Sequence, residues 1–267
     1  MAVRNQFIVG TATSVGKNTI ACCLLSAARR SGISATPFKP FAIDVVAHEQ
    51  CVSDPPWTPS ISHQAIAAGR TPSAEMNPIR LLYHTSDRFT CNVWNEKSTT
   101  SDFKQTESLC RTRIEDALEK LKPFDVVICE GSGGMVDGLG MDVFNRTVAD
   151  LLDPEIVLVA NARNGGAYAQ LVGTLALMDE RAVCRVRSLV INEMNNSIHR
   201  PIFWEFCEIV RARFGVDSVE VVPTFSSIDI DESEHVADGD AYFIDGVDFV
   251  ADRMRVCAPS LFEFLPA

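Results

Sequence analysis

The sequence has no long apolar run. A membrane-spanning helix needs about 18 consecutive apolar residues, and no segment of the chain has them. The first ten residues, MAVRNQFIVG, also lack the apolar core of a secretory signal peptide. Basic residues are in deficit: 24 Lys and Arg stand against 35 Asp and Glu, for a net charge of −11. Because this charge repels polyanions and anionic lipid surfaces, we expect neither nucleic acid nor a membrane as a partner.

The nine cysteines lack the spacings that mark metal sites or disulfide frameworks. Their number is odd, they are scattered, and no CxxC pair occurs. We interpret them as reduced, mostly buried thiols of a cytoplasmic protein. Apolar residues make up 46% of the chain, which is enough to form a well-buried interior and is not typical of disordered proteins.

Neither internal repeats nor a Gly/Ser linker divides the chain, so we expect residues 1–267 to form one domain. Short apolar segments alternate with amphipathic helical patterns, which predicts an α/β fold with a doubly wound, mainly parallel sheet covered by helices on both faces. The predicted strands lie at residues 7–10, 34–39, 124–131, 155–161, 186–192 and 219–223, and the predicted helices at 16–32, 105–121, 167–178 and 201–215.

Two stretches do not follow this alternation. Residues 44–101 are expected to be irregular apart from a short helix in SHQAIAAG, and they are expected to supply the contacts to the substrate. The acidic segment Ile228 to Asp240 is interpreted as a solvated loop rather than a metal site, because charge-rich stretches usually lie in water.

The stretch GTATSVGKNT, from Gly10 to Thr19, connects a predicted strand to a predicted helix. A Gly-Lys pair that opens a helix is typical of a phosphate-binding loop, because backbone N–H groups and the lysine face the phosphates. The pattern G-x4-G-K-[ST] is broken twice, because Gly10 lies one residue early and Asn18 replaces the hydroxyl residue. On these residues alone, an incidental strand-to-helix turn remains an alternative. The predicted nucleotide-binding residues of the loop are Thr13, Ser14, Val15, Gly16, Lys17, Asn18 and Thr19.

The motif GTATSVGKN resembles the loop G-T-x-T-x-V-G-K-[ST] of the dethiobiotin synthase and cobyric acid synthase family, in which the early glycine is normal. TPFKP and VVICEGSGG resemble that family's second strand with its functional lysine and its acidic strand end. MNP…TSD and NARNGGAYAQLVGTLALM are similar to segments of cobyric acid synthase, and EGSGGMVDG also matches cobyrinic acid a,c-diamide synthase. The resemblance runs in order from about Phe7 to Pro223 and implies a P-loop NTPase-type fold.

Two lysines are the predicted catalytic residues. Lys17 would neutralise β- and γ-phosphate oxygens. Lys39 ends a strand at the sheet edge where α/β proteins bind ligands, and the resemblance gives it the transferred phosphoryl group or the acceptor carboxylate. A surface lysine is the alternative for Lys39. The resemblance also assigns Asn192 to the adenine, and Asp137, Arg163 and Asn164 are weaker candidates for substrate binding.

The predicted metal ligands are Asn18, Asp54 and Glu130. Glu130 follows a predicted buried strand, where a carboxylate suits Mg2+, although a solvated carboxylate is the alternative. Asn18 has no hydroxyl, but its amide oxygen is a neutral, weaker ligand. Alignment with cobyric acid synthase puts the expected acidic ligand on Pro56, so Asp54 would have to replace it.

The resemblance implies ATP and Mg2+ and an ATP-dependent C–N ligase of biotin or cobalamin biosynthesis. Such an enzyme phosphorylates a carboxylate or a carbamate before a nitrogen nucleophile displaces phosphate. Because 267 residues leave no room for a glutamine-hydrolysing domain after Pro223, we expect free ammonia, a separate ammonia-supplying subunit, or an amine on the substrate. The expected substrate is a small-molecule carboxylate or diamine, and the expected assembly is a homodimer.

Two alternatives to this ligase remain open. Dethiobiotin synthase, which carboxylates and closes a ring on diaminopelargonic acid, is favoured by the stand-alone length and disfavoured by the MNP…TSD and LVGTLALM matches. A non-catalytic nucleotide-binding or partner-binding protein is favoured by the unusual residues at Asn18 and Pro56.

Overall fold

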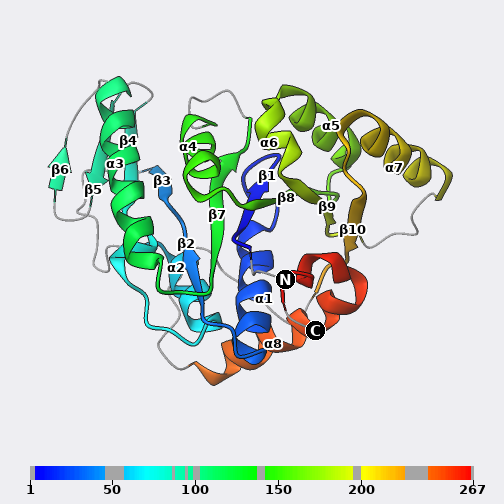
Figure 1. Cartoon of the computed structure of the whole chain (residues 1–267), viewed down its shortest axis with the longest axis horizontal. Coiled ribbons are helices and arrows are strands. Elements are labelled where there is room, and N and C mark those ends of the chain that lie inside the picture. The colour runs from blue at the N-terminus through cyan, green and yellow to red at the C-terminus, as the bar shows by residue number, and fades with distance from the viewer. Residues whose placement is uncertain are drawn as a thin grey trace.

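The computed structural model describes residues 4–45, 57–85, 88–93, 96–98, 103–136, 142–194, 200–225 and 240–265. Its centre is a six-stranded sheet in which every neighbouring pair of strands is parallel (Figure 1). The strands follow the spatial order β10 (Ser218–Val222), β9 (Val186–Asn192), β8 (Glu155–Asn161), β1 (Gln6–Gly10), β7 (Val126–Gly134) and β2 (Ala35–Phe38). The predicted α/β fold with a mainly parallel sheet is confirmed.

Helices cover both faces of this sheet, as predicted. Along β1, Phe7 and Val9 pack into one apolar cluster, whereas Ile8 packs into another on the opposite face. Figure 1 shows α1 and α8 together on one side of the sheet, and α4 and α5 on the other. The first cluster contains residues of α3 (Phe103–Leu121), α4 (Asp142–Leu152), α5 (Ala167–Leu177), α6 (Glu180–Cys184) and α7 (Arg200–Phe214). The second contains residues of α1 (Lys17–Arg30), α2 (Pro59–Ala67), α8 (Ala241–Cys257) and the short 3-10 helix η2 (Pro259–Phe262).

The prediction that residues 44–101 are irregular apart from one short helix is wrong. This part of the chain contributes a second sheet with the strand order β3 (Phe41–Val45), β4 (Ile79–Thr85), β5 (Arg88–Val93) and β6 (Glu96–Ser98). β3 and β4 are parallel, whereas β4, β5 and β6 are antiparallel neighbours. Polar and apolar residues alternate in RFTCNV, which is a sequence pattern typical of strands. The predicted short helix is confirmed as α2, which begins at Pro59, a residue suited to the first helical position.

Helix α8 was not predicted, although its apolar residues have helical spacing. Phe243, Val247, Val250 and Met254 are buried against the sheet. The carboxylate of Asp240 caps the helix by accepting a hydrogen bond of 3.0 Å from the backbone N–H of Phe243. Apart from Asp240, the acidic segment interpreted as a solvated loop, residues 228–239, lies outside the described residues.

The parallel strands bring three functional segments to one edge of the main sheet. The loop of residues 11–16 leaves the carboxyl end of β1, and Lys39 directly follows β2. Strand β7 lies between β1 and β2, so its acidic segment reaches the same edge. This is the edge at which ligands bind in open α/β sheets. Within the described residues, no helix combines the length and apolar character needed to cross a bilayer.

Candidate functional site

The glycine at the start of the phosphate loop is required by close packing. A Cβ atom at Gly10 would lie 2.7 Å from the carbonyl oxygen of Ala12 and 2.7 Å from Cγ2 of Val15, closer than non-bonded atoms tolerate. Gly10 is held there by a hydrogen bond of 2.7 Å from the N–H of Met135 to its carbonyl oxygen. The early glycine that breaks the general phosphate-loop pattern is therefore what allows this loop to fold back on itself.

The second glycine of the loop, Gly16, sits at the N-cap of α1 with a left-handed backbone (φ 99°). A Cβ atom there would lie 2.1 Å from Nδ2 of Asn192. The same Nδ2 donates a hydrogen bond of 3.0 Å to the carbonyl oxygen of Val15. Asn192, predicted to contact adenine, thus braces the loop from the end of β9, and its predicted role toward adenine stays a prediction.

The N-terminus of α1 faces the loop without a side-chain cap. Gly16 offers no capping atom, and the first turn of the helix contains no acidic residue. Because the first N–H groups of a helix have no partner within the helix and lie at the positive end of its dipole, this terminus suits an anion such as a phosphate. Thr13 and Ser14 are exposed, Val15 is buried and Thr19 is half-buried.

Lys17, the first residue of α1, directs its ammonium group back over the loop. Its Nζ donates hydrogen bonds of 3.0 Å to the carbonyl oxygens of Ala12 and Gly133. The side chain is buried, so its charge lies in a region where water screens it weakly. Gly133 belongs to β7, and Lys17 therefore ties the phosphate loop to the neighbouring strand.

Lys39 and Glu130 form a buried ion pair beside the loop. Lys39 Nζ lies 2.8 Å from Glu130 Oε1, and the two side chains are only 13% and 5% exposed. The alternative of a surface lysine therefore does not hold for Lys39, nor that of a solvated carboxylate for Glu130. Glu130 lies within β7, opposite Ile8 of β1, and thus inside the strand predicted at residues 124–131.

Beyond Glu130, the pairing of β7 with β1 becomes irregular. Ile8 pairs with Glu130, but Gly10, two residues on, pairs with Gly134, four residues on. Asn145 of α4 supports this bulge, since its Nδ2 donates hydrogen bonds of 3.0 Å to the carbonyl oxygens of Ser132 and Gly134. A bulge next to a polar cluster is a common way to aim side chains at a site.

Asn77, the central residue of the MNP motif, holds the segment that carries Lys39. Its Nδ2 donates a hydrogen bond of 2.8 Å to the carbonyl oxygen of Lys39, and its Oδ1 accepts one of 3.0 Å from the N–H of Thr58. The N–H of Lys39 donates to the carbonyl oxygen of Met76 at 2.7 Å. The motif therefore fixes the backbone around the predicted catalytic lysine and joins it to the start of α2.

Two residues of α2 that sequence reasoning missed complete the cluster. The side-chain Nε2 of Gln64 donates a hydrogen bond of 2.9 Å to Oδ1 of Asn18 and a second, short one to Oε2 of Glu130. Nδ2 of Asn18 lies 3.4 Å from Nδ1 of His63. Residues Ser60 to Ala67 of α2 are all buried, so the polar members of this helix need partners. Local sequence gives no signal for these two residues, because their importance comes from contacts with distant segments of the chain.

The remaining predicted residues lie around or outside this cluster. Arg163 follows β8 and pairs with Glu193, whose Oε2 lies 2.7 Å from Nε of Arg163. Asn164 is exposed on the same turn. Asp54 and Asp137 lie outside the described residues, so their predicted roles as metal ligand and substrate contact stay predictions.

The donor set at the cluster suits a hard divalent cation. Asn18 offers an amide oxygen and Glu130 a carboxylate, and such oxygen ligands are the ones that Mg2+ prefers. Within the described residues, no group of three or more His, Cys, Asp or Glu side chains could hold a metal ion by itself. This agrees with Mg2+ sites that use one or two protein carboxylates together with the phosphates of a substrate.

Cys129 lies next to Glu130 in β7 but is not suited to covalent catalysis. Burial, together with the nearby charge of Glu130, raises the pKa of its thiol well above the ordinary range. Because the thiolate is the nucleophilic form, this cysteine stays protonated and unreactive at neutral pH. The lysines, the carboxylate and the amides therefore remain the candidates for chemistry at this edge of the sheet.

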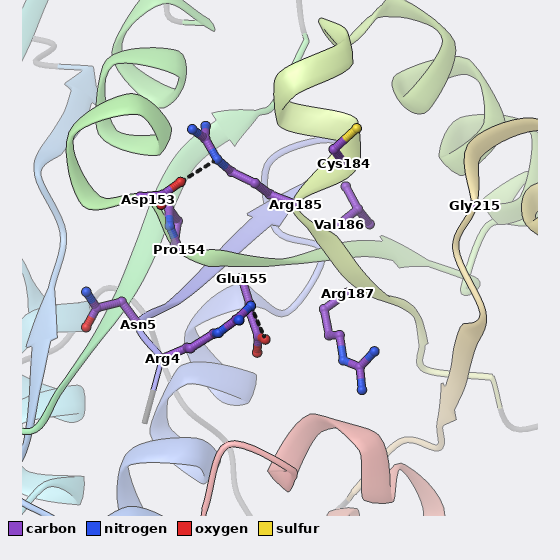
Figure 2. Close-up of a pocket in the computed structure, with 10 residues that line it drawn as sticks. All are labelled: Arg4, Asn5, Asp153, Pro154, Glu155, Cys184, Arg185, Val186, Arg187 and Gly215. Carbon is purple, nitrogen blue, oxygen red and sulfur yellow. Dashed lines mark hydrogen bonds and ion pairs between the residues drawn. The ribbon is translucent and has the colours of Figure 1, made fainter. Parts of the chain in front are cut away.

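A separate hollow of about 680 Å3 lies at the amino edge of the sheet (Figure 2). Figure 2 shows Arg4 directed toward Glu155, and Arg185 toward Asp153. Nε of Arg185 lies 2.8 Å from Oδ1 of Asp153, and NH1 of Arg4 lies 3.4 Å from Oε1 of Glu155. Its arginines are thus neutralised by neighbouring carboxylates at the end of the sheet away from the phosphate loop.

Comparison with known proteins gives matches over most of the chain. A family model described as AAA domain matches residues 4–232. Cobyric acid synthase of Clostridium botulinum is 32% identical over 198 residues, which cover 72% of this chain and 40% of that protein. Cobyric acid synthase of Chloroflexus aggregans is 30% identical over 239 residues, which cover 86% of this chain and 48% of that protein. The chain thus spans about half the length of the curated relatives it matches.

Among solved structures, the signal recognition particle receptor FtsY from Elizabethkingia anophelis in complex with GDP aligns with a TM-score of 0.48. The identity is 13%, and the alignment covers 97% of this chain and 63% of that chain.

Proposed function

Because the chain belongs to the family of P-loop proteins that includes dethiobiotin synthase and cobyric acid synthase, we propose that it is an ATP-dependent ligase that activates a carboxylate for C–N bond formation. Membership in this family implies that the chain binds a nucleotide together with a divalent metal ion. The observation that supports the ligase most is the buried Lys39–Glu130 pair beside a phosphate loop. An ion pair in that position is costly to desolvate, and stability alone does not require it.

In this proposal, the loop and Lys17 hold the phosphates of ATP. The N–H groups at the start of α1 and the Lys17 ammonium surround the β- and γ-phosphates, and Gly16 allows the close approach of the backbone. Asn18 and Glu130 would hold Mg2+, which neutralises charge on the phosphate oxygens when bound. The carbonyl oxygens that now accept from Lys17 keep its ammonium aimed at the loop.

Lys39 is proposed to position the acceptor carboxylate and the transferred phosphoryl group. A carboxylate oxygen of the substrate attacks the γ-phosphorus, the bond to the β-phosphate oxygen breaks, and ADP leaves. An amine nitrogen then attacks the acyl carbon, inorganic phosphate leaves, and the nitrogen loses a proton. In this proposal Lys39 stabilises negative charge, so the protein contributes positioning and electrostatics rather than covalent chemistry.

The proposed substrate is a small carboxylic acid, and the relatives named cobyric acid synthase point to a corrinoid carboxylate. For the nitrogen source, free ammonia, a separate ammonia-supplying subunit and an amine on the substrate all remain proposals. The homodimer likewise remains a proposal.

Transfer of isotope from the acid to phosphate tests the proposed reaction. The protein is incubated with ATP, MgCl2, ammonium chloride and an 18O-labelled corrinoid carboxylic acid, and the released phosphate is analysed by mass spectrometry. One 18O atom in the phosphate, absent with Lys17→Ala, is the expected result, because the carboxylate oxygen is the one that is phosphorylated. Phosphate without 18O contradicts carboxylate activation.

Two further outcomes identify the rival functions. Turnover of diaminopelargonic acid with bicarbonate, without any reaction of the corrinoid acid, identifies a dethiobiotin synthase. Tight nucleotide binding without phosphate release with any acid or amine identifies a non-catalytic binding protein. Both outcomes contradict the proposed ligase.

A further inference from the structure

The side chain of Gln64 occupies the centre of the polar cluster and has no role in the function proposed above. It is fully buried in α2, a helix that is enclosed on all sides from Ser60 to Ala67. A buried amide is constrained by each group to which it forms a hydrogen bond. The contacts of Gln64 are therefore evidence for the kind of ligand that binds at this position.

The amide nitrogen of Gln64 links the two predicted metal ligands. Nε2 donates one hydrogen to Oδ1 of Asn18 and the other to Oε2 of Glu130. Lys39 binds the other carboxylate oxygen, Oε1, at 2.8 Å. Oδ1 of Asn18 and Oε2 of Glu130 are oxygens of the kind that Mg2+ prefers. Both lie within hydrogen-bond distance of the same NH2 group, which carries a partial positive charge.

The other end of the same amide is unsatisfied. Across the described ranges of the chain, no hydrogen-bond donor reaches Oε1 of Gln64, although the side chain is fully buried. Buried carbonyl oxygens without a donor are rare in folded proteins and call for an explanation. An amide oxygen is a suitable ligand for a hard cation, and a half-turn about the last side-chain torsion exchanges Oε1 and Nε2 without moving the backbone.

We infer that Gln64 is a further ligand of the divalent cation, with an amide that reverses when the cation binds. Without the cation, the NH2 group holds Asn18 and Glu130 together by hydrogen bonds. With the cation, the amide turns over and Oε1 joins Oδ1 of Asn18 and Oε2 of Glu130 as a third oxygen. The inference rests on the proposed function, since that function supplies the cation together with the nucleotide.

Gln64 compensates for the missing hydroxyl at position 18. Asn18 and Glu130 alone give two protein oxygens, of which one is a neutral amide, and neutral ligands bind Mg2+ more weakly than carboxylates do. A third oxygen from α2 raises the ligand count without adding charge next to Glu130. The unusual Asn18 is then part of a working variant of the site rather than a sign of its decay.

Titration of Mn2+ followed by electron paramagnetic resonance tests this role in the presence of a non-hydrolysable ATP analogue. Gln64→Leu removes both amide atoms at similar size, and we expect Mn2+ to bind about 10-fold more weakly. Gln6→Leu is the matched control, because Gln6 is also a buried glutamine and its Nε2 donates to Glu155 and to the carbonyl oxygen of Arg4 at the opposite edge of the sheet. Mn2+ affinity should not change in that variant. Unchanged or tighter binding in Gln64→Leu would show that Gln64 only plugs the site.

A second variant keeps the test decisive if Gln64→Leu does not fold. Gln64→Glu supplies an oxygen in both orientations but places a carboxylate beside Glu130, so we expect lower thermal stability without metal and a larger increase in Tm on addition of Mn2+ than in the wild type. An equal increase in Tm overturns the inference. The 18O experiment is independent of this one, because wild-type protein that binds Mn2+ through Gln64 but transfers no oxygen contradicts the ligase and leaves the ligand assignment standing.

Discussion

The carboxyl edge and the amino edge of the main sheet both carry charged side chains, but these side chains differ in burial and in the number of groups they contact. At the carboxyl edge, the side chains of Lys39 and Glu130 are 13% and 5% exposed, and both contact the same small cluster. At the amino edge, Arg4 and Asp153 are 73% and 81% exposed, and each pairs with a single neighbour around a hollow. A cavity with charged walls is therefore present where the chemistry is not expected.

The difference shows that burial and convergence mark the site better than charge does. Exposed ion pairs contribute about 0–1 kcal/mol each to the free energy of unfolding and are screened by salt. Their presence at a surface is therefore weak evidence for a functional site. Buried charges cost several kcal/mol to desolvate and persist only when their partners are well placed. The buried charges at the carboxyl edge have this desolvation cost and lie next to a phosphate loop. For this reason we propose that the chemistry takes place there.

The largest expected effect is that of Lys17→Ala on phosphate release. Removing the ammonium that is proposed to contact the transferred phosphate should lower the rate by at least about 1,000-fold, because preorganised charge in a weakly screened site stabilises the transition state strongly. The measurement is phosphate release with ATP, MgCl2 and the acid substrate, with circular dichroism as a check of folding. A rate within about 10-fold of the wild type would place the phosphates elsewhere.

Lys39→Met should lower the free energy of unfolding by about 3 kcal/mol, because it leaves the Glu130 carboxylate buried without its cation. Urea unfolding measures this loss. The double variant Lys39→Met with Glu130→Gln should recover part of the stability, since no unpaired charge remains. A loss below about 1 kcal/mol in the single variant would mean that the pair behaves like the exposed pairs of the amino edge.

Asn18→Thr restores the hydroxyl of the general phosphate-loop pattern but removes the amide that contacts Gln64 and His63. We expect phosphate release to fall about 10-fold, which corresponds to about 1.4 kcal/mol, because the cluster is built around the amide. A clear gain of Mg2+-dependent activity would show instead that the site is a weakened form of the general pattern. The assay is the same phosphate release at several concentrations of MgCl2.

The smallest effect is expected at the amino edge. Arg185→Ala removes an arginine that pairs with Asp150 and Asp153, both more than half exposed. The free energy of unfolding should change by less than about 1 kcal/mol, and phosphate release should stay at the wild-type rate. Urea unfolding and the release assay measure the two quantities. A loss of activity here would make the hollow in Figure 2 part of the working site.

The sequence predicts the main sheet and its phosphate loop well, because buried parallel strands are short, nearly continuous apolar runs. The runs FIVG and EIVLVAN became β1 and β8 within about a residue of their predicted ends. The second sheet was missed, although the alternation of polar and apolar residues in RFTCNV is a signal of a strand. Helix α8 has clear helical spacing and could have been found.

The candidate site was predicted in part. Lys17, Asn18, Lys39 and Glu130 were identified from motifs, and the structure brings them to one edge of the sheet. Gln64 was missed, because its importance comes from burial in α2 and from contacts with two distant segments, neither of which local sequence shows. The bulge that follows Glu130 in β7 depends on support from Asn145 of α4, which is also a tertiary contact.

Isothermal titration with a non-hydrolysable ATP analogue and MgCl2 tests the central claim, that the functional site lies at the carboxyl edge, most directly. Wild-type protein, Lys17→Ala and Arg185→Ala are compared at the same salt concentration. We predict one binding site per chain in the wild type and in Arg185→Ala. In Lys17→Ala we predict at least about 100-fold weaker binding, because the proposed contact between the ammonium and the phosphates is lost. Binding that survives Lys17→Ala but is lost in Arg185→Ala would contradict the account.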